Sequence, residues 1–314
     1  MLHSTRHGPL SHKPYLNPAR LRKRKRVTLI AAFRYGIGTP DSGVVICADS
    51  LEQWQSYRAI VKKIEPRSTD KYDIVIGGAG NTGALIDGQV EAIVRSVRRW
   101  RMPDISEAEA EIRIGSVLSS YHQNFIVPFQ ASAEDKHLQF IVCLRSKQSG
   151  TFYLWKIDST VISPIDRYWL IGWHDGIYFY ETEWLWRPDL TVSHAALLGI
   201  RLLSIAKHNP NIGEDTRVLA INNAGVTEPY SETDIQALEQ RFAELDNQIA
   251  GLILGCTDLA LPARELIARF RNFENWAFAF RTITLQVHDA SHAHFAANAE
   301  ITVSGEVVKK DKDL

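Results

Sequence analysis

Val27-Thr-Leu-Ile-Ala-Ala-Phe-Arg34 and Gly43-Val-Val-Ile-Cys-Ala-Asp49 are two runs of apolar and β-branched residues, which is typical of β-strands. A cluster of Gly, Thr, Pro, Asp and Ser residues separates them, so we expect the two strands to form a hairpin. Further strands are expected at 58–64 and 72–77, after which a Gly-rich turn, Ile76-Gly-Gly-Ala-Gly80, leads into a helix. The folded part of the chain is therefore expected to open with a group of strands.

The alternation of strands and helices continues to about residue 228. Helices are expected at 81–100, 106–125, 175–185 and 191–207, and strands at 137–145, 151–157, 160–163, 167–172, 216–222 and 225–228. This order predicts an α+β fold in which two mainly antiparallel sheets are packed together, with a helix pair on each outer face. We expect this four-layer αββα sandwich to occupy residues 27–230.

Residues 231–314 are expected to form a C-terminal extension made of helices and a strand. Apolar residues repeat there with spacings of three and four, as a heptad stripe (Ile235, Leu238, Phe242, Leu245, Ile249 and Leu252). The stripe has two explanations: the core-facing side of a docked helix, or a coiled-coil contact with a partner. A short helix at 263–270, a strand at 276–287 and a charged tail are expected to follow.

Composition is that of an ordinary globular protein, with 45% hydrophobic and 23% charged residues in 314. No apolar run approaches the roughly 20 residues that a membrane-spanning helix needs. The cysteines, Cys47, Cys143 and Cys256, stand in apolar contexts where a small buried hydrophobic residue is expected, which suits a reducing compartment. We therefore expect a cytoplasmic protein that does not enter a membrane.

Charge is distributed unevenly although the net charge is zero. Residues 1–26 hold eight Lys and Arg residues and no acid, so the remainder has 36 − 8 = 28 basic and 36 acidic residues, a net charge of −8. A body of charge −8 offers no surface for nucleic acid. Residues 1–26 lack hydrophobic periodicity and are expected to be a disordered basic arm, although a tether to RNA or a membrane is an alternative.

Four residues in the first strands and the Gly-rich turn form a candidate catalytic set. Thr28 provides a hydroxyl nucleophile, Lys63 a positive charge, Asp49 a carboxylate to hold the lysine, and Gly78 a backbone N–H group. Each also has a structural explanation. Thr28 is a strand former, Asp49 and Gly78 are turn or bend residues, and Lys63 is a surface residue.

The order of these segments resembles that in 20S proteasome β subunits and their bacterial relatives. The resemblance rests on Thr28–Arg34, Gly43–Ser50, Val61–Ile64 and Ile76–Ile86, and downstream on Leu170-Ile-Gly172, Asp189–Val192 and Val218–Ile221. It covers about residues 26–228. It implies an N-terminal-nucleophile (Ntn) hydrolase fold for the αββα sandwich.

The resemblance also implies a role for each candidate residue. In the family, the first residue of the mature chain is a Thr whose hydroxyl attacks an amide carbonyl and whose own α-amino group is the general base. Thr28 matches this nucleophile, and Lys63 matches the lysine that stabilises the developing alkoxide. Asp49 matches the carboxylate that orients the lysine, and Gly78 matches the glycine whose N–H group binds the oxyanion.

An α-amino base requires Thr28 to be the first residue of the mature protein, and 27 residues precede it. One route is a propeptide that is removed by autolysis. Another is a start of translation at Val27, with removal of the initiator residue before Thr28. Either route would expose the amine.

The leading hypothesis is a proteasome-like, threonine-type peptidase that cleaves peptide or related amide bonds, needs no cofactor or metal, and assembles as a ring or other homo-oligomer. One alternative is a catalytically inactive scaffold subunit, because three family features differ. Val27 replaces the Gly that precedes the catalytic Thr, Asn209-Pro-Asn-Ile-Gly-Glu214 lacks the helper acid and hydroxyl, and Gly172-Trp-His-Asp-Gly176 lacks a serine. A small-molecule Ntn amidohydrolase is the second alternative.

Overall fold

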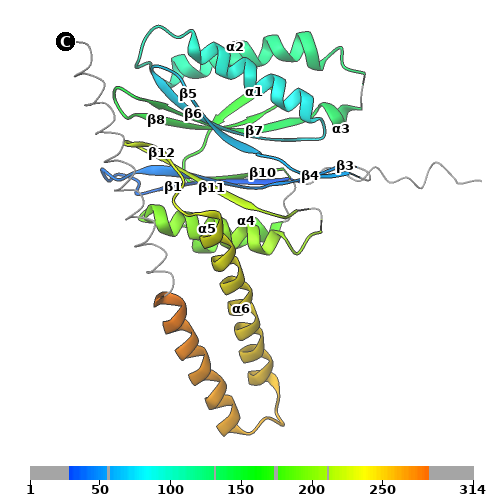
Figure 1. Cartoon of the computed structure of the whole chain (residues 1–314), viewed down its shortest axis with the longest axis vertical. Helices are drawn as coiled ribbons and strands as arrows, with labels where there is room; N and C mark the ends of the chain where they lie inside the picture. Colours follow the sequence, from blue (N-terminus) through cyan, green and yellow to red (C-terminus); the bar gives the residue numbers. More distant parts are fainter. Residues whose placement is uncertain (1–27, 55–56, 131, 173–175, 211, 283–314) are drawn as a thin grey trace, which may run out of the picture.

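A computed structural model describes residues 28–282, apart from 55–56, 131, 173–175 and 211. The basic arm expected at 1–26 and the tail after residue 282 lie outside the described residues. The body has the predicted layers, with two antiparallel five-stranded sheets packed between helices (Figure 1). The expected α+β, αββα class is therefore confirmed.

The first sheet has the strand order β10-β1-β2-β11-β12. Its strands are β1 (Leu29–Tyr35), β2 (Gly43–Asp49), β10 (Tyr168–Gly172), β11 (Thr216–Asn222) and β12 (Gly225–Thr227). All residues of β2 are buried, because one face of the strand packs on helices and the other packs on the second sheet. This is why β2 is a continuous apolar run rather than an alternating one.

The second sheet has the order β5-β6-β7-β8-β9, which follows the sequence. Its strands are β5 (Ile64–Ser68), β6 (Tyr72–Gly80), β7 (Leu138–Ser146), β8 (Phe152–Asp158) and β9 (Val161–Pro164). Pro66 is tolerated in β5 because β5 is an edge strand. A separate hairpin, β3 (Leu51–Trp54) with β4 (Tyr57–Ile60), connects the two sheets.

Helices α1 (Gly83–Arg98) and α2 (Glu107–Tyr121, followed by a π-helical turn at His122–Ile126) cover the second sheet, and α4 (Gly176–Leu185) and α5 (Val192–Ala206) cover the first (Figure 1). A short α3 (Ala133–Lys136) precedes β7. Side-chain caps mark where helices begin. Ser106 accepts from the Glu109 N–H group at 3.2 Å, and Thr191 accepts from the His194 N–H group at 3.3 Å.

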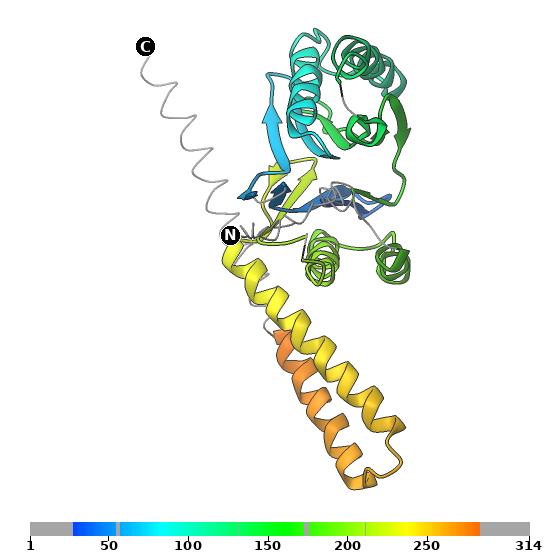
Figure 2. The same ribbon diagram turned by 90° about the vertical axis from the view of Figure 1, so that its right-hand side faces the viewer.

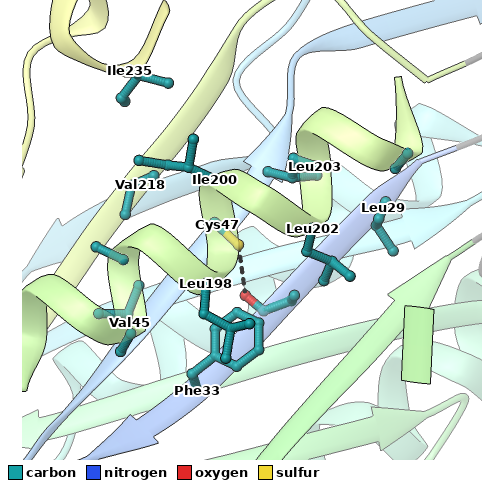
Figure 3. Close-up of a cluster of buried hydrophobic side chains, with 14 of the residues drawn as sticks. Leu29, Phe33, Val45, Cys47, Leu198, Ile200, Leu202, Leu203, Val218 and Ile235 are labelled. Atoms are coloured by element: carbon teal, nitrogen blue, oxygen red, sulfur yellow. Dashed lines mark hydrogen bonds between the residues drawn. The ribbon is translucent and has the colours of Figure 1, made fainter. Parts of the chain in front are cut away.

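The core beneath α5 is formed by side chains from β1, β2 and β11. Figure 3 shows Phe33, Val45 and Cys47 beneath Leu198 and its neighbours on α5. The Cys47 thiol donates a 3.7 Å hydrogen bond to the carbonyl of Ala31. A second core lies between the two sheets, and a third lies beneath α1 and α2.

The extension is a helical hairpin that projects from the body (Figures 1 and 2). Its first arm is α6 (Glu232–Thr257), which begins with a capping box between Ser231 and Asp234. Its second arm is a helix at residues 263–282 that lies beside α6. Among the described residues, no helix combines the length and the apolar character that crossing a membrane requires.

Two expectations about this extension are corrected. The helix predicted at 263–270 continues to residue 282, so residues 276–282, expected to begin a strand, are helical. The cause is packing on α6. Trp276 donates to the Glu244 carboxylate at 3.4 Å, and the Phe280 ring lies 5.6 Å from that of Phe242.

Two expectations near the site are also corrected. The predicted Gly-rich turn at 76–80 is part of β6, where Gly78 pairs with Phe140 of β7. The single strand predicted at 58–64 is the end of β4 and the start of β5, with Lys63 in the connection between them. Both changes result from pairing with strands distant in sequence.

Candidate active site

Thr28 and Asp49 are brought together by the pairing of β1 with β2. Thr28 directly precedes β1, and Asp49 is the last residue of β2. The antiparallel register pairs Ile30 with Ala48, which places Leu29 beside Asp49. The backbone N–H group of Leu29 donates to Asp49 Oδ1 at 2.9 Å, so the predicted carboxylate is held next to the predicted nucleophile.

Lys63 completes the contact from the opposite side. Its Nζ atom lies 2.7 Å from Asp49 Oδ2, and the side chains are only 6% and 0% exposed. Burial raises the pKa of the Asp49 carboxyl above its ordinary value, while the Lys63 ammonium and the N–H groups of Leu29 and Gly213 act against that rise. The pair is thus a buried charge pair, not a surface salt bridge.

Gly78 lies on β6 where the strand loses its neighbour. The last pair between β5 and β6 is Ile64 with Gly77, so in the described part of the chain no strand pairs with β6 on that side beyond Gly77. A Cβ atom at Gly78 would lie 2.5 Å from Ile86 Cγ2 and 3.0 Å from a ring carbon of Phe140. A side chain at Gly78 would therefore crowd Ile86 and Phe140, and the half-buried Gly78 lies where β5 no longer covers the edge of β6.

Thr28, Lys63 and Gly78 line one cavity of about 370 Å³. Asp49 lies behind Lys63 and lines a neighbouring cavity of about 290 Å³, which shares Lys63 with the first. The structure therefore brings the four predicted residues together from β1, β2, β6 and the connection before β5. Residues that carry a hydroxyl, an ammonium and a strand edge line one cavity, as nucleophilic attack on a carbonyl would require.

Gly172 and Gln139 support Thr28 but were not among the candidates. Gly172, at the end of β10, has φ of +92°, and a Cβ atom there would lie 1.8 Å from the Thr28 carbonyl oxygen. Its N–H group donates to Gln139 Oε1 of β7 at 3.1 Å. The glycine is visible in the sequence as the end of a strand, but the close approach to Thr28 is a tertiary contact without a sequence signal.

The segment that stands where the family has its helper residues, Asn209–Glu214, lies against the end of β2. The carbonyl of Gly213 accepts from the Leu51 N–H group at 3.1 Å, and the Asp215 N–H group donates to Ser50 Oγ at 2.9 Å. Residues 173–175, in the Gly172–Gly176 turn that lacks the family's serine, lie outside the described residues. The first segment therefore braces the Asp49 end of the site.

A search of the described residues for metal-binding groups finds no cluster of three or more His, Cys, Asp and Glu side chains suited to an ion. The cavity is lined by the candidate residues Thr28, Lys63 and Gly78, together with other charged residues such as Glu65 and Arg67.

Comparisons with known proteins find similar structures but no match by sequence. No model of a protein family matches the chain, and no curated protein matches it. Among solved structures, Anbu from Yersinia bercovieri, described as an ancestral β-subunit, has a TM-score of 0.57 and 14% identity, over 71% of this chain and 96% of that one.

Two structures of Anbu from Hyphomicrobium sp. strain MC1 are also similar. A mutant has a TM-score of 0.56 and 16% identity, over 71% of this chain and 96% of that one. Another structure of Anbu from this strain has a TM-score of 0.55 and 16% identity, over 71% and 97%. At such identities the likeness concerns the fold: this chain has a proteasome-like Ntn fold.

Proposed function

We propose that this protein is a threonine-type amide hydrolase of the bacterial proteasome-related branch, an endopeptidase whose nucleophile is Thr28. The single observation that carries the proposal is that Thr28, Lys63 and Gly78 line one cavity. The buried pairing of Lys63 with Asp49 supports it, because desolvation of both charges offsets most of their attraction, so the pair adds little stability that would by itself explain its presence.

The proposed reaction begins with Thr28 at the start of the mature chain. Its α-amino group, with an ordinary pKa of about 7.7–8.0, accepts the hydroxyl proton as Oγ bonds to the amide carbon. The backbone N–H group of Gly78 stabilises the oxyanion. The carbon–nitrogen bond then breaks and the leaving amine takes the proton. Water next hydrolyses the ester, which releases the acid and restores Thr28.

Lys63 and Asp49 have supporting roles in this reaction. Lys63 lines the cavity, and its ammonium lowers the energy of the negative charge that develops on Oγ. Asp49 fixes that ammonium by a 2.7 Å contact and is itself fixed by the Leu29 N–H group. Asp49 therefore acts through Lys63 rather than on the substrate.

An inactive scaffold subunit with the same fold is the second candidate. Asn209-Pro-Asn-Ile-Gly-Glu214 favours it, because the segment has no acid or hydroxyl at the positions where the family has its helpers. A small-molecule amidohydrolase would use the same residues on shorter substrates. For all three functions, we propose the same division of the chain, with an Ntn-hydrolase domain at 27–230 and an extension at 231–314.

The proposal includes self-association into a ring or another homo-oligomer in the cytoplasm, with peptides or polypeptides as substrates. Light scattering on the protein made from its native gene measures the assembly. A monomer at working concentration would contradict this part of the proposal without affecting the chemistry.

The decisive test combines intact mass with substitution of Thr28. We expect a mature chain that starts at Thr28 and cleaves fluorogenic peptides, and Thr28→Ala is expected to reduce turnover at least about a thousandfold. Thr28→Ser keeps a hydroxyl and should retain part of the activity. Thr151→Ala, on an exposed position, is the matched control.

Two results would overturn the proposal. Unchanged turnover in Thr28→Ala would exclude Thr28 as the nucleophile. A mature protein that starts at Thr28 and cleaves neither peptides nor small amides would support the scaffold alternative. Cleavage that is confined to small amides would favour the small-molecule hydrolase.

A further inference from the structure

The inner wall of the cavity beside Thr28 is aliphatic. Leu51 and Ile76 line it and are only 2% and 3% exposed, so they form its deepest part. Val61, Ile86 and Val90 also line it and are half-buried. A wall of this kind stabilises a bound group by removing its apolar surface from water.

The charged groups that line the same cavity are paired with another charged residue or lie toward solvent. Arg67 contacts Glu65 at 2.6 Å and Glu91 at 3.6 Å, and Lys63 is paired with Asp49. Lys62, Asp87 and Glu91 are exposed, so they form its rim. A charged substrate side chain against the aliphatic wall would lose water without gaining a free counter-charge, because Lys63, Glu65 and Arg67 already have partners.

Helix α1 contributes two parallel rows of side chains to the cavity. Ile86 and Val90 are four residues apart and share one face of the helix, and Asp87 and Glu91 form the adjacent row. Ile86 lies directly over Gly78, since a Cβ atom there would be 2.5 Å from Ile86 Cγ2. The aliphatic row therefore starts at the proposed oxyanion site and continues about 5–6 Å along the helix, one turn.

We propose that the cavity selects substrates that carry a bulky, uncharged aliphatic or aromatic side chain on the acyl side of the amide bond to be cleaved. With the reacting carbonyl at Gly78, that side chain lies against Ile86 and Val90, and the polar part of the substrate lies toward the rim. This selection rests on the proposed function for its orientation, but the binding preference is measured without turnover.

The test is equilibrium binding to full-length Thr28→Ala protein, which cannot form an ester through Thr28. The probes are N-acetyl tripeptide amides that differ only in the last residue: Leu, Phe, Ala, Lys or Glu. We expect the Leu and Phe peptides to bind about ten- to a hundredfold more tightly than the others, the range that apolar contacts supply in such pockets. Lys or Glu peptides that bind as tightly as Leu would overturn the proposal.

A charge inside the aliphatic row should redirect the preference. Val90→Glu, made in the same background, is expected to lower the affinity for the Leu peptide and to raise the Lys-to-Leu affinity ratio at least about tenfold. Arg98→Gln is the matched control, because it makes the same charge change on α1 and does not line the cavity. An equal change of the ratio in both variants would contradict the assigned position of the side chain.

Val90→Thr is a milder variant at the same position, which can be measured if Val90→Glu does not fold. It keeps the shape of the residue and replaces a methyl group with a hydroxyl, so it should weaken Leu binding several-fold with little effect on Lys binding. If the Leu preference is found but wild-type protein cleaves nothing, the proposed function fails and the selectivity stands. If peptides are cleaved without such a preference, only the selectivity fails.

Discussion

At the scale of single residues, the Asp49–Lys63 pair is held almost completely out of water. Such a pair contributes little net stability, because desolvation of both charges offsets most of their attraction. Breaking it is different, since the remaining charge stays buried without a partner. The pair therefore gives a sharp way to test whether the site is assembled as described.

Asp49→Asn and Lys63→Met should each lower the free energy of unfolding by about 3–5 kcal/mol, the usual cost of leaving one buried charge alone. The double variant should lose clearly less than the sum, because no buried charge remains. Urea unfolding of the three variants measures this. Glu265→Gln, in an exposed pair with Arg269, is the control and should change stability by less than about 1 kcal/mol. Additive losses would contradict the contact.

Gly172 is the second residue on which the position of Thr28 depends. Backbone strain alone costs about 1–3 kcal/mol when a residue other than glycine adopts such a conformation. We expect Gly172→Ala to destabilise the fold by more than this, because its Cβ would overlap the Thr28 carbonyl oxygen. Gly38→Ala is matched to it, with φ of +82° and no atom within 4 Å of the added carbon. Thermal unfolding compares the two; equal losses would mean that the close approach is absent.

At the scale of elements, α6 changes its environment along its length. Its first half docks on α5 and β11 through Ile235, Leu238 and Phe242, which are buried in the core. Two ion pairs also hold α6, one from Arg201 of α5 to Asp246 and one from Lys207, directly after α5, to Glu239, both at 2.6 Å. Its second half belongs to the projecting hairpin. The heptad stripe is therefore core-facing at its start, and Ile249 further along is exposed.

Leu238→Ala tests this division. Leu238 is 1% exposed, so its truncation should cost about 2–5 kcal/mol by leaving a cavity beneath α6. Ile253→Ala, on the same helix but 60% exposed, should change stability by no more than about 0.5 kcal/mol. Denaturant titrations give both values. A large effect at Ile253 would mean that something covers the projecting half in solution.

At the scale of the whole molecule, the layers place the cysteines in different environments. Cys47 lies in the core beneath α5, Cys143 lies between the sheets, and Cys256 is exposed on the hairpin. Burial raises the pKa of both the Cys47 and the Cys143 thiols to about 12. Since the thiolate is the reactive form, both buried thiols stay protonated and unreactive near neutral pH.

Alkylation followed by mass spectrometry checks this prediction for both cores together. At pH 8 we expect one label per native chain, at Cys256, and three labels after unfolding in denaturant. Raising the pH toward 10 should not add labels, because a pKa of about 12 leaves both buried thiols protonated. Rapid labelling of Cys143 in the native protein would mean that the sheets are not packed together.

Most of the strands and helices could be predicted from the sequence, because hydrophobic periodicity reports which face of a segment is buried. The β1 and β2 runs, the α1 and α5 stripes and the β7 to β10 series lie within a few residues of their expected bounds. The exceptions are segments whose conformation depends on a distant partner. Residues 276–282 are rich in aromatic residues and were expected to be a strand, but packing on α6 makes them helical.

The αββα layering and the candidate residues Thr28, Asp49, Lys63 and Gly78 could be predicted without a structure, because strand ends, glycines and apolar runs are local features of the chain. The fold was needed to show that Lys63 contacts Asp49 at 2.7 Å, and that Gly78 lies in a strand at an open edge rather than in a turn. The close approach of Gly172 to the Thr28 carbonyl is likewise visible only in the fold. These features depend on the register between strands that are far apart in the chain, which periodicity within one strand does not encode.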